Sequence, residues 1–306
     1  MASWNLVIGI IFSLQTIVGI FGNFSVLYFY LFLHCTRCKF RSTDLILKNL
    51  TVANLLIIFS KRVPQMMAGF GLKDFLNDFG CKLVFCVHRV SRDVSIVTTC
   101  LLSVFQAITI SPFNFKLAEL KVKAHKYLAT SSILYWILNT MLNIILPLYM
   151  TDKRNNTNFT QKVDYGYSYA IYDGTITPKL YVTLILCRDG FCLMLIVSAS
   201  AFMVFFLHKH QQQVRYIHRN NLSPRSSPES TAMQSILVLL CTFVSLWTLS
   251  SIFHTFLVAS NNPSWCLRNT STLINACFPT ISPYILINYD SRISRVCFAW
   301  NRMQNP

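Results

Sequence analysis

The chain has 306 residues, of which 53% are hydrophobic and only 12% charged. Soluble domains carry about 25% charged residues, so this composition is too poor in charge to coat a soluble protein of this size and instead indicates a membrane protein. The formal net charge of +16 raises the alternative of nucleic-acid binding. That function needs a broad solvated basic face, which so few charged residues do not provide.

Seven apolar runs follow one another along the chain, each close to or above the length of about 20 residues that crosses the hydrocarbon core as a helix. The sequence therefore predicts an all-α membrane protein, a bundle of seven transmembrane helices in one domain spanning residues 1–306. Its predicted spans are 6–33, 45–70, 81–110, 127–150, 180–207, 233–260 and 271–289.

The connecting segments differ in charge from one side of the predicted bundle to the other. Residues 35–43, 111–126, 208–232 and the tail after residue 289 carry fourteen Lys and Arg against three acids. The opposite side carries seven basic residues and five acids. Because basic loops stay in the cytosol, this asymmetry predicts an extracellular N-terminus. It also argues against nucleic-acid binding, since the basic loops are short and separated by spans.

Glycosylation sequons support the same orientation. Asn155 and Asn158 begin sequons in the long loop between the fourth and fifth predicted spans, and Asn269 begins one in the predicted loop before the last span. Both loops are extracellular in the predicted topology, where glycan is attached.

Ionisable residues cluster in the outer halves of three predicted spans. A charged side chain that faces lipid near the centre of a span costs roughly 3 kcal/mol or more. Such residues therefore usually face the bundle interior. Arg89 and Asp93 are four residues apart on one helix face and form a candidate ion pair, and Asp189 is a candidate partner for Arg92 or Arg62. The candidate ligand-binding residues are Arg62, His88, Arg89, Arg92, Asp93, Arg188 and Asp189.

Two interpretations of this cluster remain open at the level of sequence. It forms either a cavity that opens outward and binds an acidic or hydrogen-bond-accepting small molecule, or a set of ion pairs that fixes helix packing. Ion translocation is disfavoured because the acids are few and no polar ladder continues inward.

The sequence contains no catalytic or cofactor-binding motif, so we expect neither an enzyme nor a bound cofactor. Cys35 and Cys38 have a Cys-x-x-Cys spacing, but no second ligand pair accompanies them and no metal site is predicted. Composition indicates membrane lipid as a partner, and the first interpretation of the ionisable cluster indicates a small molecule.

Four strings resemble the vomeronasal type-1 receptors, a family of G-protein-coupled pheromone receptors. They are LILKNLTVANLLIIFSKRVPQMMAGFGLK (Leu45–Lys73), FLNDFGCKLVFCVHRVSRDVSIVTTCLLSVFQAITISP (Phe75–Pro112), RDGFCLMLIVSASAFMVFFLHKHQQQVRYIH (Arg188–His218) and CFPTISPYILI (Cys277–Ile287). The resemblance covers nearly the whole chain. It implies a chemosensory receptor in the plasma membrane, a pheromone-like ligand and an inhibitory-type heterotrimeric G protein as partner.

The chain departs from that pattern at one position with structural consequences. Cys81 matches the cysteine that usually pairs with a cysteine in the second outer loop, yet that loop has none here. Cys266 is the other cysteine expected outside. The alternatives to a signalling receptor are a seven-helix transporter, for which an inverted repeat is lacking, and a receptor-like protein without signalling.

Overall fold

The computed structural model describes residues 2–35, 42–70, 77–110, 131–144, 150–151, 162–164, 169–171, 176–217, 228–259 and 264–289. The first half of the chain contains α1 (Ala2–Cys35), α2 (Ser42–Ile57), the π-helix η1 (Ile58–Arg62), α3 (Val63–Gly69) and α4 (Asp78–Ile110). A helix over residues 131–143 follows. The second half contains α6 (Ile176–Ile217), α7 (Pro228–Ala259) and α8 (Trp265–Tyr289).

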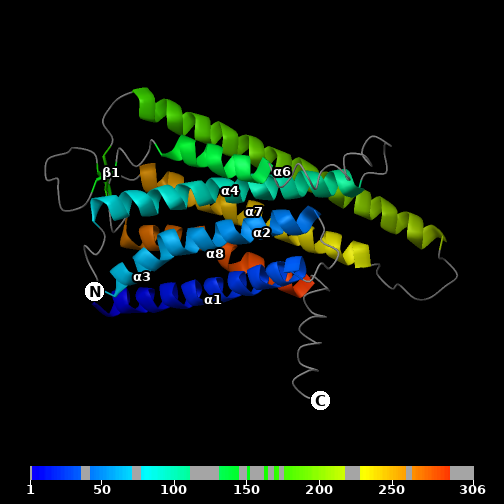
Figure 1. Ribbon diagram of the computed structural model, residues 1–306, viewed down its shortest axis with the longest axis horizontal. Coiled ribbons are helices and arrows are strands. Elements are labelled where there is room, and N and C mark those ends of the chain that lie inside the picture. Colours follow the sequence, from blue (N-terminus) through cyan, green and yellow to red (C-terminus); the bar gives the residue numbers. More distant parts are fainter. Residues whose placement is uncertain are drawn as a thin grey trace, which may run out of the picture.

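These helices run roughly side by side along the long axis of the molecule (Figure 1). The segments α2, η1 and α3 form one continuous rod, and α8 packs between α1 and α7. Among the described residues, five stretches are long and apolar enough to cross a membrane: Val7–Leu33, Thr43–Met67, Phe79–Ile110, Leu186–Lys209 and Ile236–Phe253. Each of the seven predicted spans contains a helix, so the prediction of a helical membrane bundle is confirmed; the extracellular N-terminus and the single-domain organisation stay predictions.

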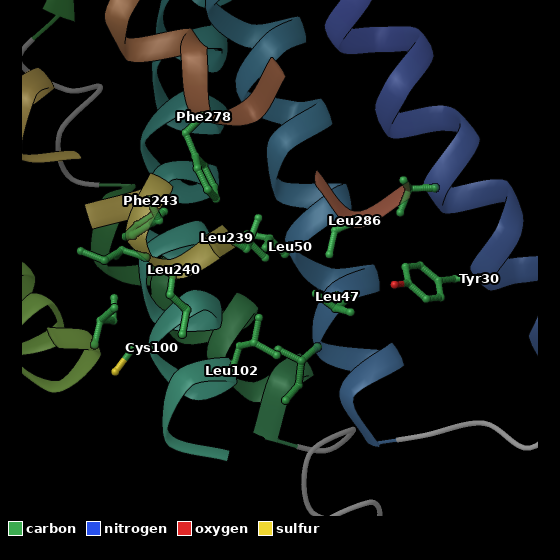
Figure 2. Close-up of a cluster of buried hydrophobic side chains, with 14 of the residues drawn as sticks. Tyr30, Leu47, Leu50, Cys100, Leu102, Leu239, Leu240, Phe243, Phe278 and Leu286 are labelled. Atoms are coloured by element: carbon green, nitrogen blue, oxygen red, sulfur yellow. The ribbon is translucent and has the colours of Figure 1, made fainter. Parts of the chain in front are cut away.

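Large apolar side chains lie both on the surface and in the core, as expected for a membrane bundle. Large apolar residues are exposed along α1 and α6, an arrangement that water disfavours and an apolar surrounding favours. Inside, the helices close on a continuous apolar cluster, in which the rings of Phe243 and Phe278 meet edge to face with centroids 4.7 Å apart. Figure 2 shows this cluster, with Tyr30, Leu47, Leu50, Cys100, Leu102, Leu239, Leu240, Phe243, Phe278 and Leu286 labelled.

Two helices differ in extent from the predicted spans. The span 127–150 was expected to be helical to its end, but the described helix stops at residue 143 and Met150 lies in a strand. Pro147 in the sequence has no N–H for the carbonyl of Asn143, and in a continued helix its ring would clash with that carbonyl, so the sequence favours an end at this residue. The last helix begins at Trp265, not near residue 271, because the hydroxyl oxygen of Ser264 accepts the Leu267 N–H at 3.2 Å and caps the first turn.

A small sheet adds β structure that the all-α prediction did not include. Strands β1 (Met150–Thr151), β2 (Lys162–Asp164) and β3 (Tyr169–Ile171) pair antiparallel in the order β1-β3-β2. Met150 pairs with Ala170, and Val163 pairs with the same residue from the other side. The sheet lies at the end of the bundle that holds the N-terminus (Figure 1).

The π-helix η1 lies between α2 and α3 in this continuous rod. Pro64 lacks an N–H, and its ring would clash with the carbonyl of Ser60 in a regular α-helix. The wider turn avoids this clash, and the Val63 N–H bonds to the carbonyl of Ile58, five residues back. Such bulges are frequent at functional sites, and this one carries Lys61 and Arg62.

Candidate ligand-binding site

A partly buried ion pair joins α4 to α6. The guanidinium of Arg188 binds both carboxylate oxygens of Asp93, with Nη2 at 2.7 Å from Oδ1 and Nη1 at 3.0 Å from Oδ2. The same guanidinium holds Asp189, whose Oδ1 accepts from Nη2 at 2.7 Å and from Nε at 3.1 Å. The single positive charge of Arg188 is therefore shared between two carboxylates.

The helix over residues 131–143 completes the surroundings of Asp93. Asn143 donates its side-chain amide to Oδ2 of Asp93 at 3.0 Å, and Tyr135 donates its hydroxyl to the backbone carbonyl of Asp93 at 3.3 Å. The Asp93 side chain is only 2% exposed, whereas that of Arg188 is 28% exposed. Side chains from three helices thus meet at one carboxylate. We call Asp93, Asn143, Arg188 and Asp189 the Asp93 network.

The predicted ion pairs of Asp93 and Asp189 are wrong. Both salt bridges found among the described residues use Arg188, and neither Arg89, Arg92 nor Arg62 takes part in one. The reason is geometric. Arg188 presents a planar fork that matches both oxygens of Asp93, and such bidentate pairs are stronger than single contacts along one helix face.

A second group of ionisable residues lies where η1 packs against α4. His88 interacts electrostatically with four positively charged side chains, and Lys61 interacts in the same way with Arg62 and Arg92. We call this group the cationic cluster. Its members are Lys61, Arg62, His88, Arg89 and Arg92.

Arg62 ties the cationic cluster to α1 and α8. Its Nη2 donates to the side-chain oxygen of Gln15 and, at 3.2 Å, to the backbone carbonyl of Leu273. The guanidinium also lies over the ring of Phe12, 5.0 Å from the centroid. Arg62 is 1% exposed, and its Nε and Nη1 have no hydrogen-bond partner among the described residues.

A cavity opens beside the cluster, between α4, α7 and α8. It has a volume of about 40 Å³, room for about three water molecules. Arg92 lines it and lies over the indole of Trp247, 4.5 Å from the ring centroid. The polar lining is completed by Ser250, which donates its hydroxyl to the side-chain oxygen of Asn275. The lining of the cavity includes His88, Arg92, Phe243, Trp247, Asn275 and Phe278.

The structure therefore divides the seven predicted ligand-binding residues into two groups. Arg62, His88, Arg89 and Arg92 belong to the cationic cluster, and only His88 and Arg92 of these line the cavity. Asp93, Arg188 and Asp189 belong to the Asp93 network. Their roles in ligand binding stay predictions.

Sequence reasoning missed the aromatic and amide side chains that accompany these charges. Trp247 and Asn275 carry no signal of their own, because aromatic and small polar residues are common in membrane helices. Asn143 could have been found from the sequence, because it and Asn139 are polar residues four apart in one predicted span. In the structure Asn143 donates hydrogen bonds to Asn139 and to Asp93.

Two other predictions concern the glycosylation sequons and the cysteines. Asn269 lies in the second turn of α8 and not in a loop, and its glycosylation stays a prediction; Asn155 and Asn158 lie outside the described residues. Cys81 is buried and Cys266 is exposed, and these two cysteines do not form a disulfide with each other.

The bundle and its enclosed charges define a multi-pass helical membrane protein with an internal cavity. The family model described as the vomeronasal organ pheromone receptor family matches residues 6–299. The chain is 50% identical over 302 residues to vomeronasal type-1 receptor 4 of Homo sapiens, covering 99% of this chain and 100% of the relative. It is 52% identical over 297 residues to vomeronasal type-1 receptor 3 of Homo sapiens, covering 97% and 95%.

The chain belongs to the vomeronasal type-1 receptor family. It is accordingly a multi-pass membrane protein of a family of chemosensory receptors, not enzymes. A more distant relative, olfactory receptor class A-like protein 1 of Danio rerio, is 26% identical over 286 residues, covering 93% of this chain and 90% of the relative.

Proposed function

We propose that this chain is a G-protein-coupled receptor that binds a pheromone-like small molecule in the cavity between α4, α7 and α8. Binding there activates a heterotrimeric G protein of the inhibitory class. The observation that carries the proposal is the position of Arg92. It lines the cavity, stacks on Trp247 and forms no salt bridge with a described carboxylate.

The lining indicates the chemistry of the ligand. Phe243, Trp247 and Phe278 offer aromatic walls, while Arg92 and Asn275 offer polar groups at fixed positions. A mostly apolar pocket with a few convergent polar groups is typical of small-molecule sites. The ligand that fits is an apolar molecule with one acidic or hydrogen-bond-accepting group.

The volume of the cavity indicates how the ligand acts. About 40 Å³ is too little for a molecule of more than a few heavy atoms, so the helices around the cavity must separate to admit it. A ligand that favours such an opened state shifts the population of receptor conformations toward it. In the proposed topology the N-terminus is extracellular, and the inner ends of α4, α6 and α7 contact the G protein.

A screen on cells tests this function. Cells expressing the full chain are exposed to volatile and urinary compounds, and cyclic AMP is measured with and without pertussis toxin, which blocks inhibitory G proteins. A compound-dependent, toxin-sensitive fall in cyclic AMP supports the proposal. Compound uptake that occurs without any G-protein signal would favour a transporter.

The variant Arg92→Ala tests the cavity as the binding site. We expect the agonist's half-maximal concentration to rise at least tenfold, or the response to vanish, while surface expression persists. Lys82→Ala is a matched control, because it removes one positive charge from the outer end of the same helix but does not line the cavity. Equal dose–response curves for Arg92→Ala and wild type would remove Arg92 from the site.

A further inference from the structure

Some of the polar side chains that line the cavity between α4, α7 and α8 already have partners in the protein. Ser250 of α7 donates its hydroxyl to the side-chain oxygen of Asn275 in α8, and the amide of Asn275 donates to the backbone carbonyl of Ser271 at 2.9 Å. Ser95 of α4 donates to the side-chain oxygen of Asn54 at 3.5 Å. A ligand therefore has little need to satisfy these lining residues.

His88 and Arg92 line the same cavity but lack such bonds. Arg92 lies over Trp247, yet it forms no hydrogen bond or salt bridge with a described residue. Nδ1 of His88 is buried without a partner, and the imidazole forms no hydrogen bond with the described part of the chain. Polar groups inside a protein are almost always hydrogen-bonded, so two unpaired ones beside one cavity mark where a bound molecule supplies the partners.

The spacing of these two residues is fixed by the helix that carries them. His88 and Arg92 stand four residues apart within α4. Residues at this spacing lie on one face of a helix, one turn apart, with their Cβ atoms about 6 Å from each other. A ligand in the cavity therefore meets two polar groups along α4 that are separated by one helical turn.

The part of the lining that α7 and α8 contribute is largely aromatic. Phe243 and Trp247 of α7 stack with their ring centroids 5.3 Å apart, and Phe278 of α8 meets Phe243 edge to face. A flat apolar body packs well against such rings. The ligand that suits both parts of the lining is therefore a ring system whose polar groups face α4.

We infer that the ligand is a cyclic hydroxy acid, with an anionic group that binds Arg92 and a hydroxyl, about one helical turn away, that binds His88. A guanidinium binds an oxyanion through paired N–H donors. A hydroxyl both donates and accepts, so it pairs with an imidazole whichever ring nitrogen carries the proton. His88 thus determines specificity among acidic ligands. The inference rests on the proposed function for the location of the ligand and adds a second polar group to it.

Matched probes of one size test the hydroxyl contact. The purified full-length receptor in lipid nanodiscs, without G protein, is titrated with para-hydroxybenzoate and with para-methylbenzoate, and each Kd is obtained from the rise in Tm with probe concentration. The two probes share the ring and the carboxylate. We expect para-hydroxybenzoate to bind about tenfold more tightly, as one hydrogen bond to a buried group provides. Ortho-hydroxybenzoate, whose hydroxyl is beside the carboxylate, should not show this gain.

Variants assign each contact to a residue. His88→Phe should make the Kd values of the two para probes equal, because it keeps a ring but removes the hydrogen bond, whereas His88→Asn keeps a donor and an acceptor and should retain part of the preference. Arg92→Gln should weaken both probes by about tenfold and leave their ratio unchanged. His208→Phe is the matched control, since His208 is exposed on α6 and does not line the cavity.

The outcomes separate this inference from the proposed function. Equal Kd values for the two para probes on the unaltered receptor overturn the inference, as does a preference that survives His88→Phe or the absence of binding by either probe at millimolar concentration. A hydroxyl preference without any fall in cyclic AMP in cells would support the inference and reject the signalling. A toxin-sensitive response to compounds that lack a hydroxyl, unchanged in His88→Phe, would support the signalling and reject the inference.

Discussion

Asn23 of α1 donates its side-chain amide to the backbone carbonyl of Pro279 in α8 at 2.8 Å. That carbonyl lies four residues before Pro283, which has no N–H to offer it. The asparagine of one helix thus supplies the hydrogen bond that a proline removes from another. Asn23 also donates to the carbonyl of Gly19 at 2.8 Å and is 1% exposed, so its amide has no access to solvent as an alternative.

Replacement of Asn23 by Ala should lower the free energy of unfolding by about 1–3 kcal/mol, because it leaves the buried carbonyl of Pro279 without a donor. Thermal melting of the purified receptor measures the change. In the Pro283→Ala background the loss should be smaller, since residue 283 then provides its own N–H. Ser25→Ala is the control, because its exposed hydroxyl donates to the backbone carbonyl of Phe21 in the same helix. Equal losses in both backgrounds would contradict this account.

The same seam depends on the absence of a side chain at residue 22. A Cβ atom on Gly22 would lie 2.9 Å from Cγ of Pro283 and 2.9 Å from Cε2 of Tyr284. Gly22→Ala should therefore push α1 from α8 and destabilise the fold by about 1–3 kcal/mol. Gly190→Ala should be neutral or slightly stabilising, because nothing lies within 4 Å of its Cβ. Melting temperatures of the two variants that do not differ would refute the close contact.

The sequence predicted well where the described helices lie but less well where they end. Apolar runs of about 20 residues are required by the thickness of the bilayer, so each span leaves a signal that does not depend on its neighbours. The start of α8 is set by a single hydroxyl, that of Ser264, and the π-helix η1 follows from Pro64. Such local features shift a boundary without changing the apolar run.

The ion pairs could not be predicted for a different reason. Helical periodicity correctly places Arg89 and Asp93 on one face of α4, but it does not say which helix packs against that face. Arg188 of α6 and Asn143 take the carboxylate of Asp93 instead. The choice depends on how three helices are rotated about their axes, which is a property of the packed bundle and not of any one segment.

The two carboxylates of the Asp93 network should differ in how much stability the receptor loses when each is removed. Asp93→Ala should destabilise the receptor by about 3–5 kcal/mol, because it leaves Asn143 and the inner face of Arg188 without their buried acceptor. Asp189→Ala should cost less, since Asp189 is more exposed and Arg188 keeps its contacts to Asp93. Surface expression and thermal melting measure both.

A compensating variant shows whether the charge or the volume matters. Asp93→Leu combined with Arg188→Met should recover part of the stability lost in Asp93→Leu alone, because no unpaired ion remains in the bundle. A double variant that melts below both single variants would mean that the contacts of Arg188 outside the pair matter more than its charge.

The contact between Arg92 and Trp247 should appear as an energetic coupling between α4 and α7. A guanidinium over an indole contributes about 0.5–2 kcal/mol, so Arg92→Ala and Trp247→Leu should be less than additive by roughly 1 kcal/mol in thermal melting. Trp247→Phe should retain part of the coupling, because a smaller aromatic face remains. Trp136→Leu serves as the comparison, since Trp136 lines a different cavity between α2, α4 and the helix over residues 131–143. Its effect should add to that of Arg92→Ala, and strict additivity of the Arg92 and Trp247 variants would show that the two side chains do not interact.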